Sequence, residues 1–178
     1  MNNKIFLVSP NDVKAASEIN YNVDDAQVAR AIRVAQNTYL REIIGDALLS
    51  KLQELIEDGT IEESIYKQYS ELCDIYCSEY LIAKANAEIC IPISLKIRNV
   101  GVAQDSDTNI NAAALEGIKE LRRYYETESA EKANRLIDFL KENKDSFSEL
   151  KGTECVCGVN NGADLKKRAN IGLYLGGK

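Results

Sequence analysis

Residues 61–89 have the sequence IEESIYKQYSELCDIYCSEYLIAKANAEI, and their spacing indicates the fold class. Apolar side chains recur at intervals of three and four, which is typical of the buried face of an amphipathic helix. They are Ile65, Tyr69, Leu72, Ile75, Tyr76, Tyr80, Ala83 and Ala87. Thr60 and Glu63 have the spacing of a capping box, and Pro92 follows the pattern. We therefore expect the longest helix of the protein over about 61–89, begun at Thr60 and stopped by Pro92.

Two helices are expected in the first 45 residues. Ser9 and Pro10 fit an N-cap and a first helical position, which predicts a short helix over about 10–17. Asp24 or Asp25 can cap a second, amphipathic helix. That helix is expected to end at Gly45, because glycine fits a left-handed C-terminal cap.

The rest of the sequence completes a mostly α-helical bundle of about five helices. A third helix is predicted over about 46–57, and one long helix or two helices with a break near 127–129 follow residue 111. The apolar run Ile5–Val8 is expected to be a strand or an anchor on the core. Phe147 and Leu150 are possible anchors in a charged linker.

Two segments interrupt this helical pattern. Apolar and polar residues alternate after Pro92, which predicts an extended arm or hairpin over about 93–110 with a polar loop at 104–109. Residues 152–178 are glycine-rich and too poor in apolar residues to bury a core of their own. We therefore expect a helical domain over 1–151 and an extended C-terminal docking tail over 152–178.

The composition excludes several classes of function. The chain has 178 residues, a mass of 19.8 kDa and 45% hydrophobic residues, as in an ordinary globular domain. It has no histidine, so neither a Ser-His-Asp nor a Cys-His catalytic site can form within it. No apolar run approaches the roughly 18 residues of a membrane span, and no signal peptide is visible. We expect a soluble protein that is made in the cytoplasm, is not an enzyme and needs no cofactor.

The net charge of −6 is unevenly distributed. Residues 152–178 contain four basic and two acidic residues, so the tail is basic while the body is acidic. An acidic body is a poor candidate for wrapping nucleic acid, whose phosphates need Lys and Arg. The difference in sign indicates that the tail has a different environment from the body.

The cysteines permit one weak metal hypothesis. Four thiolates could hold a zinc ion, with two ligands on the long helix and two in the tail. They are Cys73, Cys77, Cys155 and Cys157. Their spacing is not that of a zinc knuckle, and Cys73 lies next to an apolar stripe, where cysteine often acts as a small hydrophobe. Buried, reduced thiols are the favoured interpretation, and we predict no metal.

Three further clusters have a structural and a functional interpretation. Tyr66, Tyr69, Tyr76 and Tyr80 could form a binding face or the edge of the core. The segment Leu121–Tyr125 could grip a partner or nucleic acid through its two arginines and two tyrosines. Acidic residues crowd 46–63 and are either a solvated helix face or a channel wall along which DNA slides without sticking. The channel-facing candidates are Glu54, Glu57, Asp58, Glu62 and Glu63.

The order of these features resembles a family of head–tail connector proteins of tailed bacteriophages, the adaptors that dock beneath the portal. The segments that carry the resemblance extend over most of the chain. They are Val8–Val13, Asn22–Asp25, Ile43–Gly45, Lys96–Val102, the 105–109 loop, Leu121–Tyr125, Ala133–Leu136, Phe139–Asn143 and Phe147–Glu149. The Cys155-Val-Cys157 segment is not part of the family's pattern.

This resemblance implies a structural virion protein at the head–tail junction. It implies a homo-oligomeric ring, of twelve subunits if it matches a portal, that continues the DNA channel toward the tail. The expected partners are identical subunits, the portal and further tail or ring proteins, with no membrane and no specific DNA binding. The arm and the tail would make these contacts through Lys96, Arg98, Val100, Val102, Lys166, Lys167, Arg168, Ile171, Leu173, Tyr174 and Leu175.

Two other interpretations remain open. A helical interaction or regulatory module without a phage role would use the tyrosine-rich helix as a groove or dimer face. An enzyme using carboxylates and a metal would need a deep pocket, and no spacing of Asp and Glu singles one out.

Overall fold

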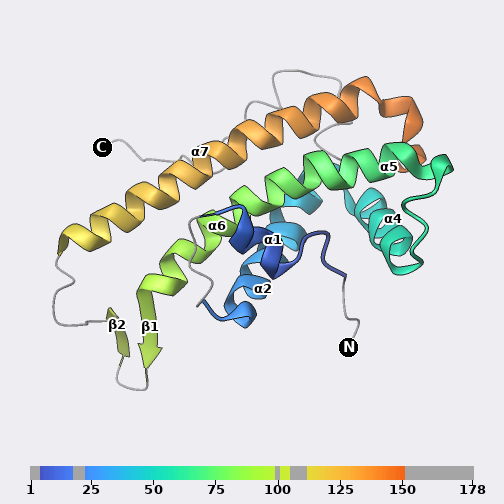
Figure 1. Cartoon of the computed structure of the whole chain (residues 1–178). Coiled ribbons are helices and arrows are strands. Elements are labelled where there is room, and N and C mark those ends of the chain that lie inside the picture. The colour runs from blue at the N-terminus through green and yellow to red at the C-terminus, as the bar shows by residue number, and fades with distance from the viewer. Residues whose placement is uncertain (1–4, 18–22, 99–100, 105–111, 151–178) are drawn as a thin grey trace.

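The computed structural model describes residues 5–17, 23–98, 101–104 and 112–150, and these residues are mostly helical. The helices form layers, with α7 on one side of α5 and α6 and with α2 and α4 on the other (Figure 1), while α1 packs against α2 and α6. Within the described residues the chain has five continuous helices, because α2 runs through a π segment into α3 and α5 runs through another into α6. The predicted helical bundle is therefore confirmed.

The N-terminal segment is an anchor and not a strand. Val8 is buried, and Ser9 caps α1 (Pro10–Ala15) in a capping box with Asp12. The fully buried Gln36 accepts a hydrogen bond from the Leu7 amide and donates one to the Ile5 carbonyl, both at 2.9 Å. A side-chain amide thus satisfies the backbone polar groups that a strand partner would otherwise satisfy.

The next helix follows the predicted boundaries. Asp24 caps α2 (Asp25–Val34), which continues through the π segment η1 (Ala35–Leu40) into α3 (Arg41–Ile44). Gly45 has a φ of 82°, a value that favours glycine, and the chain turns there into α4 (Asp46–Glu57). Gly59, with a φ of 68°, follows the end of α4.

The helix expected over 61–89 begins later and ends later than predicted. The amides of Thr60 and Ile61 both bond the Leu55 carbonyl and so complete the end of α4, and a 3₁₀ turn (Ser64–Tyr66) precedes the helix. The helix comprises α5 (Lys67–Glu71), the π segment η3 (Leu72–Cys77) and α6 (Ser78–Ser94). The prediction that Pro92 stops it is wrong. A proline in the last turn removes a single backbone bond, so the helix continues to Ser94.

The predicted arm includes a two-stranded antiparallel hairpin. Strands β1 (Leu95–Arg98) and β2 (Gly101–Gln104) pair Lys96 with Ala103 and Ile97 with Val102. The hairpin projects beyond the end of α6 (Figure 1). The first two residues of the predicted arm belong instead to α6, and the 105–109 loop lies outside the described residues.

The last helix is unbroken. α7 (Ala112–Glu142) runs antiparallel to α6 as one helix of 31 residues, so the break considered near 127–129 does not exist. Two 3₁₀ turns follow, Lys144–Ser146 and Ser148–Leu150. Phe147 is fully buried and Leu150 nearly so, which confirms both as anchors.

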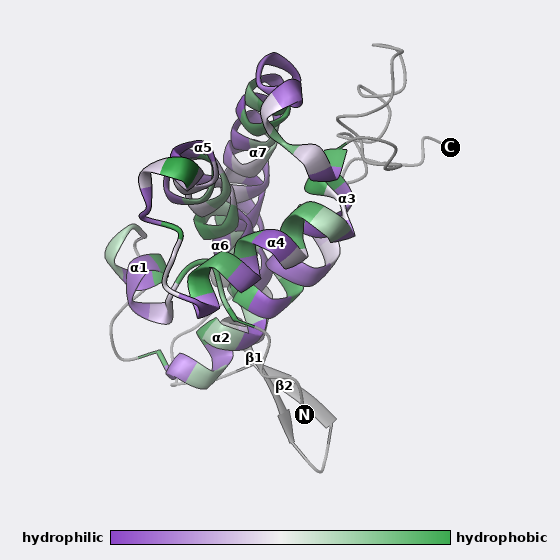
Figure 2. Ribbon diagram, turned by 90° about the vertical axis from the view of Figure 1, so that its right-hand side faces the viewer, coloured by the Kyte–Doolittle hydropathy of each residue, from purple (hydrophilic) through white to green (hydrophobic). Residues whose placement is uncertain are grey.

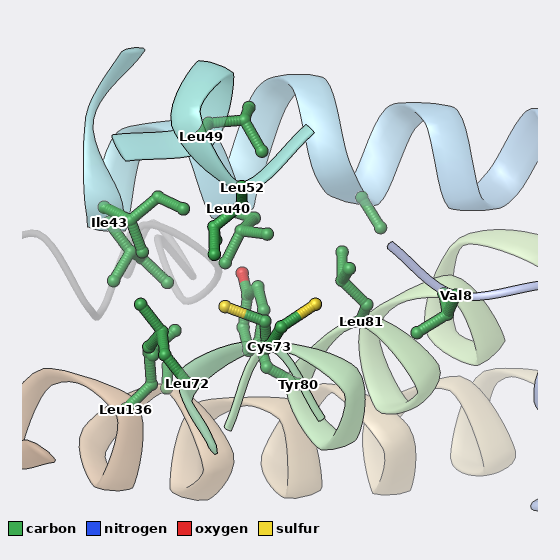
Figure 3. Packing of buried hydrophobic residues seen from close by; sticks show 14 of the residues in the cluster. Val8, Leu40, Ile43, Leu49, Leu52, Leu72, Cys73, Tyr80, Leu81 and Leu136 are labelled. Carbon is green, nitrogen blue, oxygen red and sulfur yellow. The ribbon is translucent and has the colours of Figure 1, made fainter. Parts of the chain in front are cut away.

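The core lies between the three helical layers. Leu40, Ile43, Leu49 and Leu52 from the first layer face Leu72, Cys73, Tyr80 and Leu81 of the central helix, and Leu136 of α7 lies beside Leu72 (Figure 3). Hydrophilic and hydrophobic residues alternate along α4 and α7, as expected of helices with one buried side (Figure 2). Among the described residues, no helix is both long enough and apolar enough to cross a membrane.

Candidate interaction surfaces

An open groove lies between the C-terminal end of α1 and the half of α7 nearer the hairpin. Its lining consists of Ala15, Ala16, Ser17, Leu121, Tyr124, Tyr125 and Glu128. Leu121 is 40% exposed and Tyr124 62% exposed, which are high values for large apolar or aromatic side chains. Their spacing at 121, 124, 125 and 128 places the α7 residues on one helix face. The groove lining therefore mixes apolar side chains with polar groups, including Ser17 and the Glu128 carboxylate.

The side chains of the basic-aromatic segment 121–125 lie on different faces of α7. Its two arginines do not line the groove. Arg122 pairs with Glu126 at 2.9 Å on the same helix, and Arg123 is exposed. Tyr125 is buried and meets the Tyr124 ring edge to face, with centroids 5.4 Å apart. Tyr124 thus rests on a buried neighbour, which holds it at the surface.

The hairpin contains three of the predicted partner-binding residues. Lys96 and Arg98 lie on β1 and Val102 on β2, whereas Val100 lies outside the described residues. A two-stranded hairpin is marginally stable by itself in water and gains stability when another surface covers it. Within the described chain β1 contacts α6, from which it emerges.

The acidic residues predicted to face a channel gather around the end of α4. Glu54, Glu57, Asp58, Glu62 and Glu63 are all exposed. Glu54 pairs with Lys51 at 3.0 Å, and this hydrogen bond raises the pKa of Lys51. We call Glu57, Asp58, Glu62 and Glu63, together with Ile65, the acidic corner. Ile65 was expected on a buried face but is 76% exposed, because it lies in the 3₁₀ turn before α5.

The end of the described chain lies close to this corner. Leu150 is buried, and the 3₁₀ turn that contains it packs on α4. The Tyr69 hydroxyl donates to the Glu149 carboxylate at 2.8 Å, and the Tyr69 ring meets Phe147 edge to face at 5.1 Å. Burial, and then the neighbouring Glu149 carboxylate, raise the pKa of Tyr69 to about 12. Residues 152–178, including the remaining predicted partner-binding residues, lie outside the described residues.

The tyrosine-rich helix mainly contributes to the core. Tyr80 is buried, and burial raises its pKa. Tyr76 stacks on Phe139 of α7, with centroids 4.1 Å apart. Tyr66 is partly covered and lies 6.1 Å from Tyr69, with the Lys51 ammonium 6.0 Å from its ring. Ile75 is the exception on this helix, since it was expected to be buried and is 43% exposed.

The two helical thiols are core residues. Cys73 and Cys77 are free and buried, as the preferred interpretation predicted. Burial raises the pKa of Cys73 to about 12 and raises that of Cys77 strongly, so both thiols stay protonated in the core at neutral pH. The described residues contain no group of three or more side chains placed to hold a metal ion. Cys155 and Cys157 lie outside this part of the chain.

A polar contact between the first layer and the central helix was missed from the sequence. The Lys84 ammonium lies 3.9 Å from the centre of the Tyr39 ring and 3.4 Å from the Glu88 carboxylate. Burial, followed by Glu88, raises the pKa of Tyr39. Lys84 and Glu88 look like a solvated pair at i and i+4, but alanines at 83, 85 and 87 surround them. This charged pair within an otherwise largely apolar stretch of helix was the sequence signal from which the contact could have been predicted.

Comparison with known families identifies one relationship. Residues 40–159 match the model of a family of unknown function (DUF6712), and the chain belongs to that family. The matched region begins in η1 and includes the hairpin and all of α7. No curated protein sequence and no solved structure matches the chain.

Proposed function

We propose that this member of a family of unknown function is a structural subunit of a bacteriophage head–tail connector, a ring that docks to the portal and continues the DNA channel toward the tail. The observation that supports it best is a pair of unlike surfaces on one chain. The hairpin projects from the end of α6, while the groove lies between α1 and α7. The sequence resemblance to the connector family is the other support.

A ring requires such a pair of surfaces. Head-to-tail contacts close into a ring only when each subunit offers two different, complementary patches. The hairpin of one subunit would lie in the groove of the next. Lys96 and Arg98 of the hairpin complement the Glu128 carboxylate of the groove. The contact would also cover Leu121 and Tyr124, and a large aromatic side chain is a common interface anchor.

The acidic residues fit a passage for DNA. Glu54, Glu57, Asp58, Glu62 and Glu63 are exposed around one end of α4. Carboxylates repel phosphates, so a wall that carries them lets DNA slide without the tight contacts that Lys and Arg make. In this proposal about twelve subunits match the portal, and the basic 152–178 tail reaches the portal or a neighbouring subunit.

A mixing experiment tests the head-to-tail contact. One variant carries Lys96→Glu and Arg98→Glu, and the other carries Leu121→Asp and Tyr124→Asp. Each alone should remain monomeric at concentrations at which the wild type associates. An equimolar mixture should form dimers, because one intact hairpin meets one intact groove. Light scattering gives the masses. Oligomers of wild-type size from both separate variants would refute this contact.

A second experiment tests the partner. The portal from the same genome is mixed with the full chain or with a chain ending at residue 151. A large complex with many copies per portal, lost on truncation, is expected. If the full-length chain never binds the portal, the connector proposal fails and an interaction module without a phage role becomes the better account.

A further inference from the structure

We infer that the groove between α1 and α7 binds the guanidinium group of a partner's arginine, held between the Tyr124 ring and the Glu128 carboxylate. The groove is also used in the proposed head-to-tail contact, so this inference deepens that proposal. Only the identity of the donor, Arg98 of the next subunit, rests on the proposed function. The chemistry of the site depends on the groove alone.

The lining of the groove places two aromatic rings next to a carboxylate. Tyr124 and Tyr125 both line it, and their ring planes stand at 66° with centroids 5.4 Å apart. Glu128 follows one turn further along α7 and lines the same groove. An aromatic face attracts a cation, and a nearby carboxylate adds a charge-assisted hydrogen bond. Together these groups can receive a positively charged side chain.

The Glu128 carboxylate has no cationic partner within the described part of the chain. Its ordinary helical partner at i+4 would be Lys132, but the Lys132 ammonium bonds Glu79 of α6 at 3.0 Å instead. Glu128 is half-buried, and covering a carboxylate costs free energy unless a cation pairs with it. A partner that closes the groove therefore has to bring a positive charge.

The same combination of groups already holds a cation elsewhere in this molecule. The Lys84 ammonium lies 3.9 Å from the centre of the Tyr39 ring and 3.4 Å from the Glu88 carboxylate. There the ring comes from η1, while the cation and the carboxylate come from α6. In the groove the ring and the carboxylate are both present, and the partner supplies the cation.

A guanidinium group fits this arrangement better than an ammonium group does. It is planar, so it can stack on an aromatic ring and still bond both oxygens of one carboxylate. Tyr124 is 62% exposed, which leaves its ring open to stacking. The small side chains of Ala15 and Ala16 line the α1 side of the groove and leave room for a planar group.

Binding of a small arginine probe to the full-length chain tests this inference. The Lys96→Glu/Arg98→Glu variant is used, because its groove is intact and no neighbouring hairpin competes for it. N-acetyl-arginine amide is added, and NMR follows the backbone amide resonances of residues 121–128. These resonances should shift and saturate, with an affinity at least about fivefold higher than for the neutral N-acetyl-citrulline amide. N-acetyl-lysine amide should bind more weakly than the arginine probe.

Two further substitutions in this variant test the two parts of the site. Glu128→Gln should lower the affinity for the arginine probe at least about fivefold and leave the affinity for the citrulline probe unchanged. Tyr124→Leu keeps an apolar side chain without the ring, so it should remove the preference for arginine over lysine. The matched control is Glu131→Gln, an exposed carboxylate of α7 outside the groove lining, which should leave all three affinities unchanged.

Equal affinity for the arginine probe and either of the other two probes would overturn the inference. An equal loss with Glu131→Gln, or shifts that do not saturate, would also overturn it, because the acidic body would then attract cations without a site. A ring that forms on the portal without selective arginine binding would leave the connector proposal standing and remove this one. Selective arginine binding by a chain that never binds the portal would do the reverse.

Discussion

The two halves of α7 differ sharply although they belong to one helix. The half nearer the C-terminus buries Ala133, Leu136, Ile137, Phe139 and Leu140 against the main core. In the half nearer the hairpin, the buried residues among those whose exposure is described are Tyr125 and Ser129. We call these the core half and the hairpin half. One helix can therefore stabilise the fold at one end and present a surface at the other.

The neighbours of each half explain the difference. The core half is covered by η3, while Phe147 folds back on Tyr69 and Phe139. The hairpin half meets a second, small apolar cluster of Ala87, Cys90 and Tyr125, with Ile118 at its edge. Since burial of apolar area is the main stabilising term, the core half contributes more to the stability of the fold than the hairpin half does.

The largest test of this comparison is Phe147→Ala. Phe147 has no exposed surface and contacts two aromatic rings, so its removal should cost about 3–5 kcal/mol of unfolding free energy. Tyr124→Ala in the hairpin half should cost under about 1 kcal/mol, because Tyr124 is 62% exposed. Urea unfolding measures both. Similar losses for the two variants would mean that the halves are equally important for stability.

Alkaline pH should destabilise the protein through groups packed at the core half. The pKa of Tyr69 rises from 10.0 when unfolded to about 12 when folded. The folded protein then holds this proton more tightly, so its contribution to stability is complete below about pH 10 and is lost as pH rises through about 12. Tyr80, Cys73 and Cys77 act in the same direction.

Urea unfolding across this pH range should show stability that falls as the pH rises. Tyr69→Phe should make the fall shallower. An unchanged slope in Tyr69→Phe would show that its hydroxyl titrates equally in both states.

Thiol labelling compares the two halves directly. In a Cys155→Ser/Cys157→Ser background, Cys73 and Cys77 should react only as fast as the whole protein unfolds. Cys90 belongs to the small cluster, so local opening should expose it at least about tenfold more often. Mass spectrometry of labelled peptides gives the rates. Equal rates at all three cysteines would indicate that the halves open together.

The smallest expected loss of stability comes from removing a salt bridge. Glu79 on α6 accepts from Lys132 at 3.0 Å and from Arg135 at 2.9 Å, which ties the core half of α7 to α6. These side chains are partly exposed, so Glu79→Gln should cost about 0.5–1 kcal/mol and less in high salt. Glu126→Gln, which removes a pair within α7, should cost about 0.3–0.5 kcal/mol. A larger loss for Glu126 would reverse the ranking.

Local signals in the sequence predicted much of the fold. Ser9, Asp24 and Asp46 mark helix starts because capping and first-turn preferences depend on neighbouring residues alone. The alternation after Pro92 correctly indicated a hairpin. Predictions failed where two interactions compete for the same backbone group. Thr60 has the pattern of a helix start, but its amide is already bonded to Leu55.

Burial was less predictable than helix position. Ile65 fits the apolar spacing of the long helix, yet the helix begins after it. The π segment η3 changes the spacing within this helix, and Ile75 inside it is exposed. Gln36 gave no sequence signal, since its partners Ile5 and Leu7 lie about thirty residues away. The groove likewise depends on α1 lying beside α7, which no local pattern contains.

The two π segments have a consequence for the length of the chain. In an ordinary helix, the loss of one residue rotates everything beyond it by about 100° and moves buried side chains to the surface. A π turn already holds an extra residue, because its bonds join i to i+5. One residue could be deleted within Ala35–Leu40 or Leu72–Cys77, converting the turn to α-helix while both flanking faces stay aligned. These are the positions in the long helices where related chains can differ by a single residue and keep the same core.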